Sequence, residues 1–263
     1  MRVASTIRFL ARAFAVNAKA VLEYRVNFSL QVFGMMLNNA AFAIFWKVLI
    51  DRTGGVGGYG FSDIMFVWAV SSTSFGLAHV VAGNIRSISR MVREGELDVY
   101  LLQPRDVWLN VVCSRTIVSA WGDFAYGFIV LALMPGVGLE RWLVFLAIIP
   151  AAALVFAAAF SAAETLAFWL GDSQGISGAL QEFLLSFSLY PETIFDPGMR
   201  WIFYTLVPSA FVAYVPLAAW RGLDWGAVGI VWAAALAWLL ITRALFRAGL
   251  KRYESGNKMG ARI

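Results

Sequence analysis

The chain has 263 residues, of which 60% are hydrophobic and only 14% are charged. Soluble domains carry about a quarter charged residues, so this composition excludes an ordinary soluble domain and predicts an all-α integral membrane protein. The net charge is +5, but the basic residues flank apolar runs, which indicates membrane topology signals and not nucleic-acid binding. One cysteine and one histidine exclude an internal disulfide and a Cys/His zinc site.

Residues 1–26 are predicted to form an amphipathic helix that lies on the cytoplasmic surface of the membrane. Ile7, Leu10 and Phe14 recur at helical spacing, and five Lys and Arg residues are spread along the segment, as anionic lipid headgroups favour. No uninterrupted apolar core or cleavage site follows the first charges, so a secretory signal is not indicated. The alternative is a soluble lead-in to the first span.

Five apolar stretches are long enough to cross a bilayer, which takes roughly 20 residues. In chain order they cover residues 27–50, 61–83, 107–134, 141–170 and 225–246. A charged loop, residues 84–106, separates the second stretch from the third, and a basic cytoplasmic tail, residues 251–263, follows the last. We therefore expect one transmembrane domain over residues 27–250.

The stretch before the last span allows two interpretations. Residues 171–189 are moderately apolar, and residues 201–219 are strongly apolar but contain Pro208 and Pro216. If both cross the membrane there are seven spans. If one crosses there are six, and 16 of the 21 Lys and Arg residues then lie on the cytoplasmic side. This bias favours six spans with both termini cytoplasmic, residues 171–189 as the fifth span, and residues 190–220 as a proline-broken re-entrant hairpin on the outer side.

Three short stretches of sequence resemble a known family. Residues 93–105 read REGELDVYLLQPR, residues 190–200 read YPETIFDPGMR, and residues 207–214 read VPSAFVAY. With the basic lead-in and the order of the spans, they resemble the membrane subunit of type-2 ATP-binding-cassette (ABC) exporters, in the branch of small six-span stand-alone permeases. The resemblance implies type-2 permease architecture over nearly the whole chain, in a bacterial inner (plasma) membrane.

The resemblance also implies partners. Two permeases, identical or related, pair to form a translocation pathway, and each binds a separate cassette ATPase on the cytoplasmic side. ATP and Mg belong to that ATPase; no cofactor is implied for this chain, which lacks the GxxxxGK[S/T] phosphate-binding motif. The implied function is export of a hydrophobic or amphipathic substrate, such as a drug, lipid or peptide.

The 84–106 loop is the expected docking site for the ATPase. Ile85, Ile88 and Val92 lie on one helical face, and Gly95 is expected to end that helix before a second short segment. The resemblance implies that the docking contacts come from Arg90, Arg93, Glu94, Glu96, Leu97, Asp98 and Tyr100. From the residues alone, a solvated loop whose arginines only set the topology is the alternative.

In the layout that the resemblance implies, the first and fifth spans face the second permease and the pathway. Asn38 and Asn39 point about 100° apart on a helix, so at least one of them should face protein or a cavity. The side chains expected along the pathway and the permease interface are Phe33, Asn38, Phe42, Phe187 and Tyr190.

Ionisable side chains inside predicted spans are costly and need partners. Arg115 and Glu164 fall at similar depth in the antiparallel third and fourth spans, which predicts an ion pair between them. Asp123 has no evident partner in the sequence. His79 is expected to be a buried, hydrogen-bonded neutral side chain.

Two other classes of membrane protein fit the sequence less well than an exporter permease does. Residues 175–178 read GISG and resemble the active-site corner of intramembrane serine proteases, but the only histidine, His79, precedes them, and Ser177 then lacks a base. An ion-driven secondary transporter or channel usually shows internal repeats, and none is apparent between the two halves. No catalytic residue is therefore predicted in this chain.

Overall fold

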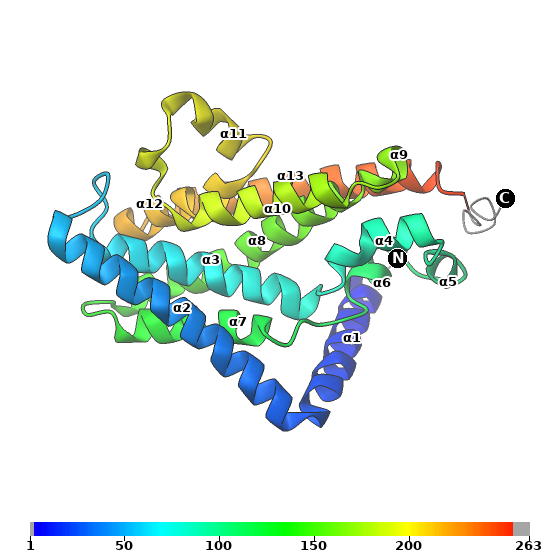
Figure 1. The fold of residues 1–263 in the computed structure, drawn as a ribbon, viewed down its shortest axis with the longest axis horizontal. Coiled ribbons are helices and arrows are strands. Elements are labelled where there is room, and N and C mark those ends of the chain that lie inside the picture. Colours follow the sequence, from blue (N-terminus) through cyan, green and yellow to red (C-terminus); the bar gives the residue numbers. More distant parts are fainter. Residues whose placement is uncertain (1–2, 255–263) are drawn as a thin grey trace.

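The computed structural model describes residues 3–254, and all of the helices and strands assigned in that range are helices, with no strand among them (Figure 1). The long helices are α1 (Val3–Glu23), α2 (Arg25–Thr53), α3 (Phe61–Val81), α7 (Ala120–Leu133), α8 (Leu139–Glu164), α10 (Gln174–Leu189) and α13 (Trp225–Leu250). The short helices are η1 (Ile85–Ser87), α4 (Ile88–Glu94), α5 (Asp98–Leu101), α6 (Val107–Val112), α9 (Ala167–Leu170), η2 (Glu192–Ile194), η3 (Pro197–Met199), α11 (Arg200–Tyr204), η4 (Ser209–Phe211) and α12 (Tyr214–Gly222). Most of the predicted basic tail lies outside the described residues.

Four helical stretches are long and apolar enough to cross a membrane: α2, α3, α8 together with α9, and α13. They match the first, second, fourth and sixth predicted spans. A bent pair of helices after α10 brings the number to five if the pair counts as one broken span. The total of six spans stays a prediction, because the third and fifth predicted spans are shorter helices.

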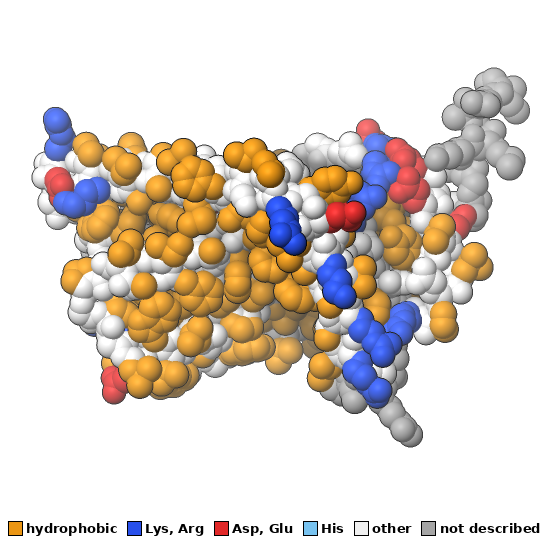
Figure 2. Space-filling view, turned by 90° about the horizontal axis from the view of Figure 1, so that it is seen from below, with side chains coloured by type: hydrophobic (Ala, Val, Ile, Leu, Met, Phe, Trp, Pro, Cys, Tyr) orange, Lys and Arg blue, Asp and Glu red, His pale blue; other side chains and the backbone are white. Residues whose placement is uncertain are grey.

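The surface fits a chain that lies in a bilayer with one basic end. The face seen in Figure 2 is largely hydrophobic, and most of its Lys and Arg side chains gather toward the end of the molecule that holds α1 and the short helices α4–α6. Basic residues concentrated beside one end of apolar helices are typical of the cytoplasmic side. The assignment of that end to the cytoplasm stays a prediction.

The third predicted span is not one continuous helix. Residues 113–119, between α6 and α7, are not helical. Their backbone bonds to the end of α3 instead: Gly83 N–H donates to the Arg115 carbonyl at 3.0 Å, and Ile117 N–H donates to the His79 carbonyl at 3.2 Å. A Cβ on Gly83 would lie 2.8 Å from the Ile117 nitrogen, so only glycine allows this contact. The prediction of an unbroken span was wrong because hydropathy does not report such long-range hydrogen bonds.

α7 packs closely along α3 because glycines remove side chains from the contact. A Cβ on Gly76 of α3 would lie 2.3 Å from the backbone nitrogen of Phe124, and one on Gly127 of α7 would lie 2.3 Å from the Ala69 carbonyl oxygen. No side chain fits at either position unless the helices move apart. The close contact brings polar side chains of α3 and α7 within hydrogen-bonding reach of each other.

The fifth predicted span, residues 171–189, is helical as α10. Its 16 residues extend about 24 Å at 1.5 Å per residue, whereas the hydrocarbon core is roughly 30 Å thick. α10 packs against α8 and α3. A full crossing by this helix stays a prediction.

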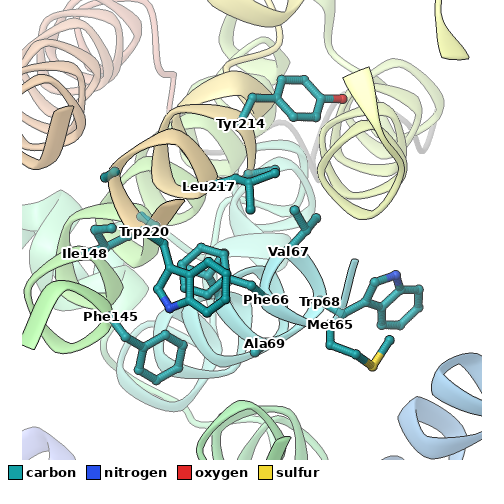
Figure 3. Close-up of a cluster of buried hydrophobic side chains, with 14 of the residues drawn as sticks. Met65, Phe66, Val67, Trp68, Ala69, Phe145, Ile148, Tyr214, Leu217 and Trp220 are labelled. Carbon is teal, nitrogen blue, oxygen red and sulfur yellow. The ribbon is translucent and has the colours of Figure 1, made fainter. Parts of the chain in front are cut away.

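The segment after α10, predicted as a re-entrant hairpin, does not form a straight span. Its helical pieces Pro197–Tyr204 and Ser209–Gly222 meet at 74°. α12 is held in the protein core: Trp220 stacks on Phe66 of α3 with ring centroids 4.6 Å apart, and Phe66 contacts Phe145 of α8 (Figure 3). Non-helical backbone at membrane depth needs such a cover of protein. The bend agrees with the predicted hairpin, whose place in the membrane stays a prediction.

The helix predicted within residues 1–26 is present as α1, which makes a sharp angle with α2 (Figure 1). Asn17 donates to the Cys113 carbonyl at 3.0 Å, and Phe14 packs against Trp121 with ring centroids 5.7 Å apart. These contacts tie α1 to the non-helical break between α6 and α7 and to the first turn of α7. The location of α1 on the membrane surface stays a prediction.

Candidate functional site

A cavity of about 280 Å³ lies between α2 and α10, with α3 and α7 behind it. At one end of the cavity α2 meets the end of α10, where Trp46 contacts Tyr190 with ring centroids 5.9 Å apart. The polar side chains that line the cavity are Asn38, Asn39, Ser72, Asp123, Glu182 and Ser186. Since α2 and α3 contribute residues from their middle turns and α7 contributes Asp123 from its first turn, the cavity lies within the helical bundle and not at its end.

Asp123 of α7 lines this cavity and is only 4% exposed. Its Oδ1 accepts hydrogen bonds from Asn39 Nδ2 at 2.7 Å and from Ser72 Oγ at 3.4 Å. The Tyr126 hydroxyl donates to the Asn39 carbonyl at 3.1 Å and holds that residue in place. The sequence showed no partner for Asp123 because its two donors lie 84 and 51 residues away along the chain. Asn39 faces protein and cavity, as expected for at least one of the Asn38–Asn39 pair.

Three of the five predicted pathway residues line the cavity, namely Asn38, Phe42 and Tyr190. Phe33 is 66% exposed on α2 and is not part of the lining. Phe187 packs into the protein core, where its ring centroid lies 4.7 Å from that of Phe203. Phe33 and Phe187 are therefore not brought to this cavity, and the role of the other three in a pathway stays a prediction.

Sequence reasoning missed other residues of the cavity. Trp68 stacks on Phe42 with ring centroids 4.8 Å apart, Ser72 bonds to Asp123, and Glu182 lies on α10 at the opposite wall. Trp68 and Ser72 lie on the same face of α3 because they are four residues apart. That spacing in the sequence could have indicated that Trp68 and Ser72 share a face of α3. It could not have indicated the hydrogen bond from Ser72 to Asp123 of α7.

The predicted docking loop, residues 84–106, forms the short helices η1, α4 and α5, and we call it the coupling segment. Its predicted apolar face is present, since Ile85 and Ile88 are fully buried. Gly95 follows α4 with φ of 75°, a left-handed conformation that ends the helix and favours glycine. The sequence therefore predicted both the helix and its end correctly.

Charged side chains of the coupling segment pair with each other and with the chain after α9. Arg90 contacts Glu94 at 3.1 Å and Glu96 at 2.8 Å. Hydrogen bonding to Glu96 raises the pKa of the Arg90 guanidinium above its ordinary value. Arg93 contacts Asp172 at 2.9 Å. These predicted docking residues are thus partly occupied by contacts within the chain.

Leu97 cannot be a docking contact in this structure because its side chain is fully buried. It belongs to the apolar cluster beneath the coupling segment, so that prediction was wrong for this residue. Tyr100 is only partly exposed. The apolar side chains that face outward are instead Val99, Leu101 and Leu102, with exposed fractions of 64%, 45% and 87%.

Two aspartates tie the coupling segment to α13 and to the residues after it. The Tyr253 hydroxyl donates to Asp98 Oδ1 at 3.0 Å, and Arg243 donates to Asp106. Asp106 also caps α6 by accepting a hydrogen bond from Leu109 N–H at 3.0 Å. Burial, together with the hydrogen bond to Asp98, raises the pKa of Tyr253 to about 12.

The predicted ion pair between Arg115 and Glu164 is not formed within the described residues. Glu164 is 4% exposed and accepts hydrogen bonds from Ser89 N–H at 3.1 Å and from Gln181 Nε2 at 2.7 Å. Arg115 lies exposed in the non-helical break between α6 and α7. The prediction was wrong because it assumed a continuous third span. Glu164 instead joins the coupling segment to α8 and α10.

The only histidine, His79, and the serine of the GISG stretch, Ser177, each lie within hydrogen-bond distance of a backbone carbonyl of their own helix. His79 is buried in α3, and its Nδ1 lies 3.0 Å from the Phe75 carbonyl, as expected for a hydrogen-bonded core histidine. The Ser177 hydroxyl donates to the Gln174 carbonyl at 3.3 Å. In residues 3–254 no group of three or more His, Cys, Asp or Glu side chains could hold a metal ion.

A family model described as "ABC-2 family transporter protein" matches residues 36–257. This range covers most of the chain and includes both the cavity and the coupling segment. The chain belongs to the ABC-2 transporter family. Membership confirms the resemblance to the type-2 ABC permeases, so this ABC-2 protein is a membrane transport component. No curated protein and no solved structure matches the chain.

Proposed function

We propose that this ABC-2 protein is the permease subunit of an exporter that works with a separate cassette ATPase. Family membership supports a transport component, and the outward-facing apolar row Val99, Leu101 and Leu102 is the observation that carries the docking proposal. In this proposal the ATPase binds ATP and Mg. The coupling segment and both termini lie on the cytoplasmic side of the inner (plasma) membrane.

The apolar row has the character of a partner interface. Burying a Val or Leu side chain contributes about 1.5–3 kcal/mol, so Val99, Leu101 and Leu102 together suffice to anchor a contact. The partly exposed Arg93 and Glu94 on the same segment supply a polar rim. Exposed apolar patches of this kind are typical of sites that bind another protein or a membrane.

The coupling segment is anchored to the transmembrane helices from three sides. Ser89 bonds to Glu164 of α8, Arg93 pairs with Asp172 before α10, and Asp106 bonds to α13. A force applied by the ATPase at the apolar row would therefore reach α8, α10 and α13 together. Closure of the ATPases on ATP would then shift the population between inward-open and outward-open permeases.

A second permease is proposed against the faces of α2 and α10 that border the cavity. Asn38 of α2 and Glu182 of α10 are both exposed on these faces. Polar and charged groups that face lipid are costly, whereas a protein partner or a wet pathway satisfies them. Exposed apolar side chains of α2 such as Leu37 and Phe33 would contribute packing. Two copies, or this chain with a related permease, would enclose the path of a hydrophobic or amphipathic substrate such as a drug, lipid or peptide.

The test is co-purification of the full chain from its host in mild detergent. Wild-type protein is expected to retain a cassette ATPase in stoichiometric amount, and the double variant Leu101→Glu/Leu102→Glu is expected to lose it. Leu139→Glu is the matched control, because Leu139 is 75% exposed on α8, far from the coupling segment in the chain. The control should keep the ATPase.

A different result would replace the exporter with the ion-driven alternative. No ATPase in the wild-type preparation, together with ATP-independent movement of ions or solutes by the purified protein in vesicles, would identify a secondary transporter or channel. A second permease in the complex would identify a heterodimer, and a single permease species a homodimer.

A further inference from the structure

The cavity between α2 and α10 is acidic. Asp123 and Glu182 line it, and none of its described lining residues is Lys, Arg or His. Resting on the exporter function proposed above, we propose that this cavity binds an amphipathic organic cation, an amine or ammonium group carried on an apolar or aromatic body. The proposal narrows the substrate class that the fold alone leaves open.

One carboxylate oxygen of Asp123, Oδ2, receives no hydrogen bond from the described residues. Both of its hydrogen bonds, from Asn39 and Ser72, end on Oδ1, and Oδ2 accepts none from residues 3–254. The side chain as a whole is 4% exposed and lines the cavity, and its Oδ2 is not fully buried, so this oxygen is open to the cavity. A carboxylate oxygen that faces a cavity and receives no hydrogen bond from the protein is available to a ligand, and a bound ammonium N–H would form a charge-assisted hydrogen bond with it.

The walls of the cavity suit the rest of such a ligand. Phe42 and Trp68 stack on each other at one side, Phe75 lies on the same helix as Trp68, and Tyr190 closes the end. Aromatic faces attract cations, and they also bury planar apolar groups. Met35 adds an adaptable apolar surface.

Glu182 places the second negative charge where a ligand would enter. It lies on α10 and is exposed, in contrast to the buried Asp123 on α7. Within residues 3–254 it accepts one long hydrogen bond, from the Ser186 hydroxyl at 3.4 Å, so its carboxylate is available to a ligand. A negative charge at the mouth of a low-dielectric cleft raises the local concentration of cations and lowers that of anions.

The test compares two probes that share the pyrenylmethyl body and differ in the head group, 1-pyrenylmethylammonium with a charged ammonium and 1-pyrenemethanol with a neutral hydroxyl. The full chain is placed in phosphatidylcholine nanodiscs, whose lipid has no net charge, and binding is measured by energy transfer from tryptophan to pyrene. Wild-type protein is expected to bind the ammonium about 10-fold or more tightly than the alcohol. Asp123→Asn keeps an acceptor for Asn39 but removes the charge, and it should weaken ammonium binding about 10- to 100-fold while leaving the alcohol unchanged.

A second variant tests the proposal even if Asp123→Asn misfolds the buried site. Glu182→Gln changes an exposed side chain and should weaken ammonium binding severalfold, again without affecting the alcohol. Glu140→Gln, at an exposed position in the first turn of α8, changes the net charge equally and should affect neither probe. The proposal is overturned if wild type binds both probes equally or not at all, or if Asp123→Asn and Glu182→Gln weaken both probes to the same extent.

This readout separates the substrate class from the exporter function, because it needs neither ATP nor an ATPase. If a cassette ATPase co-purifies but the ammonium is not preferred, the exporter stands and the cation class fails. If the ammonium is preferred but no ATPase is found, the cavity stands as a cation site and the exporter fails.

Discussion

The hydroxyl of Tyr253 donates a hydrogen bond of 3.0 Å to Asp98, which lies 155 residues earlier in the chain. Tyr253 follows α13 and Asp98 begins α5, so the contact joins the end of a membrane-spanning helix to the coupling segment. The ring of Tyr253 also packs on Phe168 of α9, with centroids 6.3 Å apart. The end of α13 and the outward-facing apolar row are thus linked through one side chain.

Tyr253→Phe is expected to lower the free energy of unfolding by about 1 kcal/mol, because it keeps the ring and deletes one hydrogen bond. The pKa of Tyr253 is raised to about 12, above the ordinary value of about 10. Its contribution is therefore present below pH 10 and is lost as the pH rises through 12. Thermal unfolding should show a difference between wild type and Tyr253→Phe at pH 8 that disappears near pH 12. Tyr24→Phe, at a residue that is 70% exposed, is the control and should cause no difference.

The contacts of Glu164 predict an energetic coupling with Gln181 and none with Arg115. Gln181→Ala removes one donor to a buried carboxylate, and Glu164→Ala leaves the Ser89 N–H and the Gln181 amide without a partner, at about 1–3 kcal/mol for each group. A double-mutant cycle on Glu164 and Gln181 should therefore give an interaction free energy of about 0.5–3 kcal/mol.

The matched cycle on Arg115 and Glu164 should give an interaction free energy close to zero. Arg115 is exposed, so Arg115→Ala alone is expected to change stability by about 0.5 kcal/mol or less. A large coupling in this cycle, measured by chemical unfolding in detergent, would restore the ion pair that the sequence suggested.

Close packing of α3 on α7 makes Gly76 intolerant of any side chain. Gly76→Ala would place a methyl group 2.3 Å from backbone of α7, so it is expected to cost more than the 1–3 kcal/mol typical of overpacked cores. Gly229→Ala is the control, because a Cβ at Gly229 of α13 meets no atom within 4 Å. Alanine is the better helix former there and should stabilise by up to about 1 kcal/mol. Size-exclusion profiles and thermal midpoints of the two variants measure the contrast.

The sequence predicted the features that depend on a single helix, such as its position and its end. It did not predict the features that depend on contacts between two segments. α2, α3, α8 and α13 follow from apolar runs alone, and Gly95 ends its helix through its own backbone conformation. The break before α7 rests on hydrogen bonds between Gly83 and Arg115, which lie on different segments. The same holds for Asp123, whose partner Asn39 lies on another helix and is fixed only by the packing. A single sequence does not show which residues of different helices contact each other.

The ion pair between Arg93 and Asp172 gives a last prediction, which rests on the proposed exporter. The pair is partly exposed, so it adds at most about 1 kcal/mol to stability, but it connects the coupling segment to the start of α10. Arg93→Asp or Asp172→Arg should leave the folded protein intact and lower substrate-stimulated ATP hydrolysis by the assembled complex about 2- to 30-fold, as coupling changes of 0.5–2 kcal/mol imply. The double exchange Arg93→Asp/Asp172→Arg should restore most of the rate. The equivalent exchange of Lys47 and Asp51, an exposed pair at the far end of α2, should have no effect in any combination. If the double exchange is no better than the single variants, the pair does not transmit the ATPase movement and the connection runs through α8 and α13 alone.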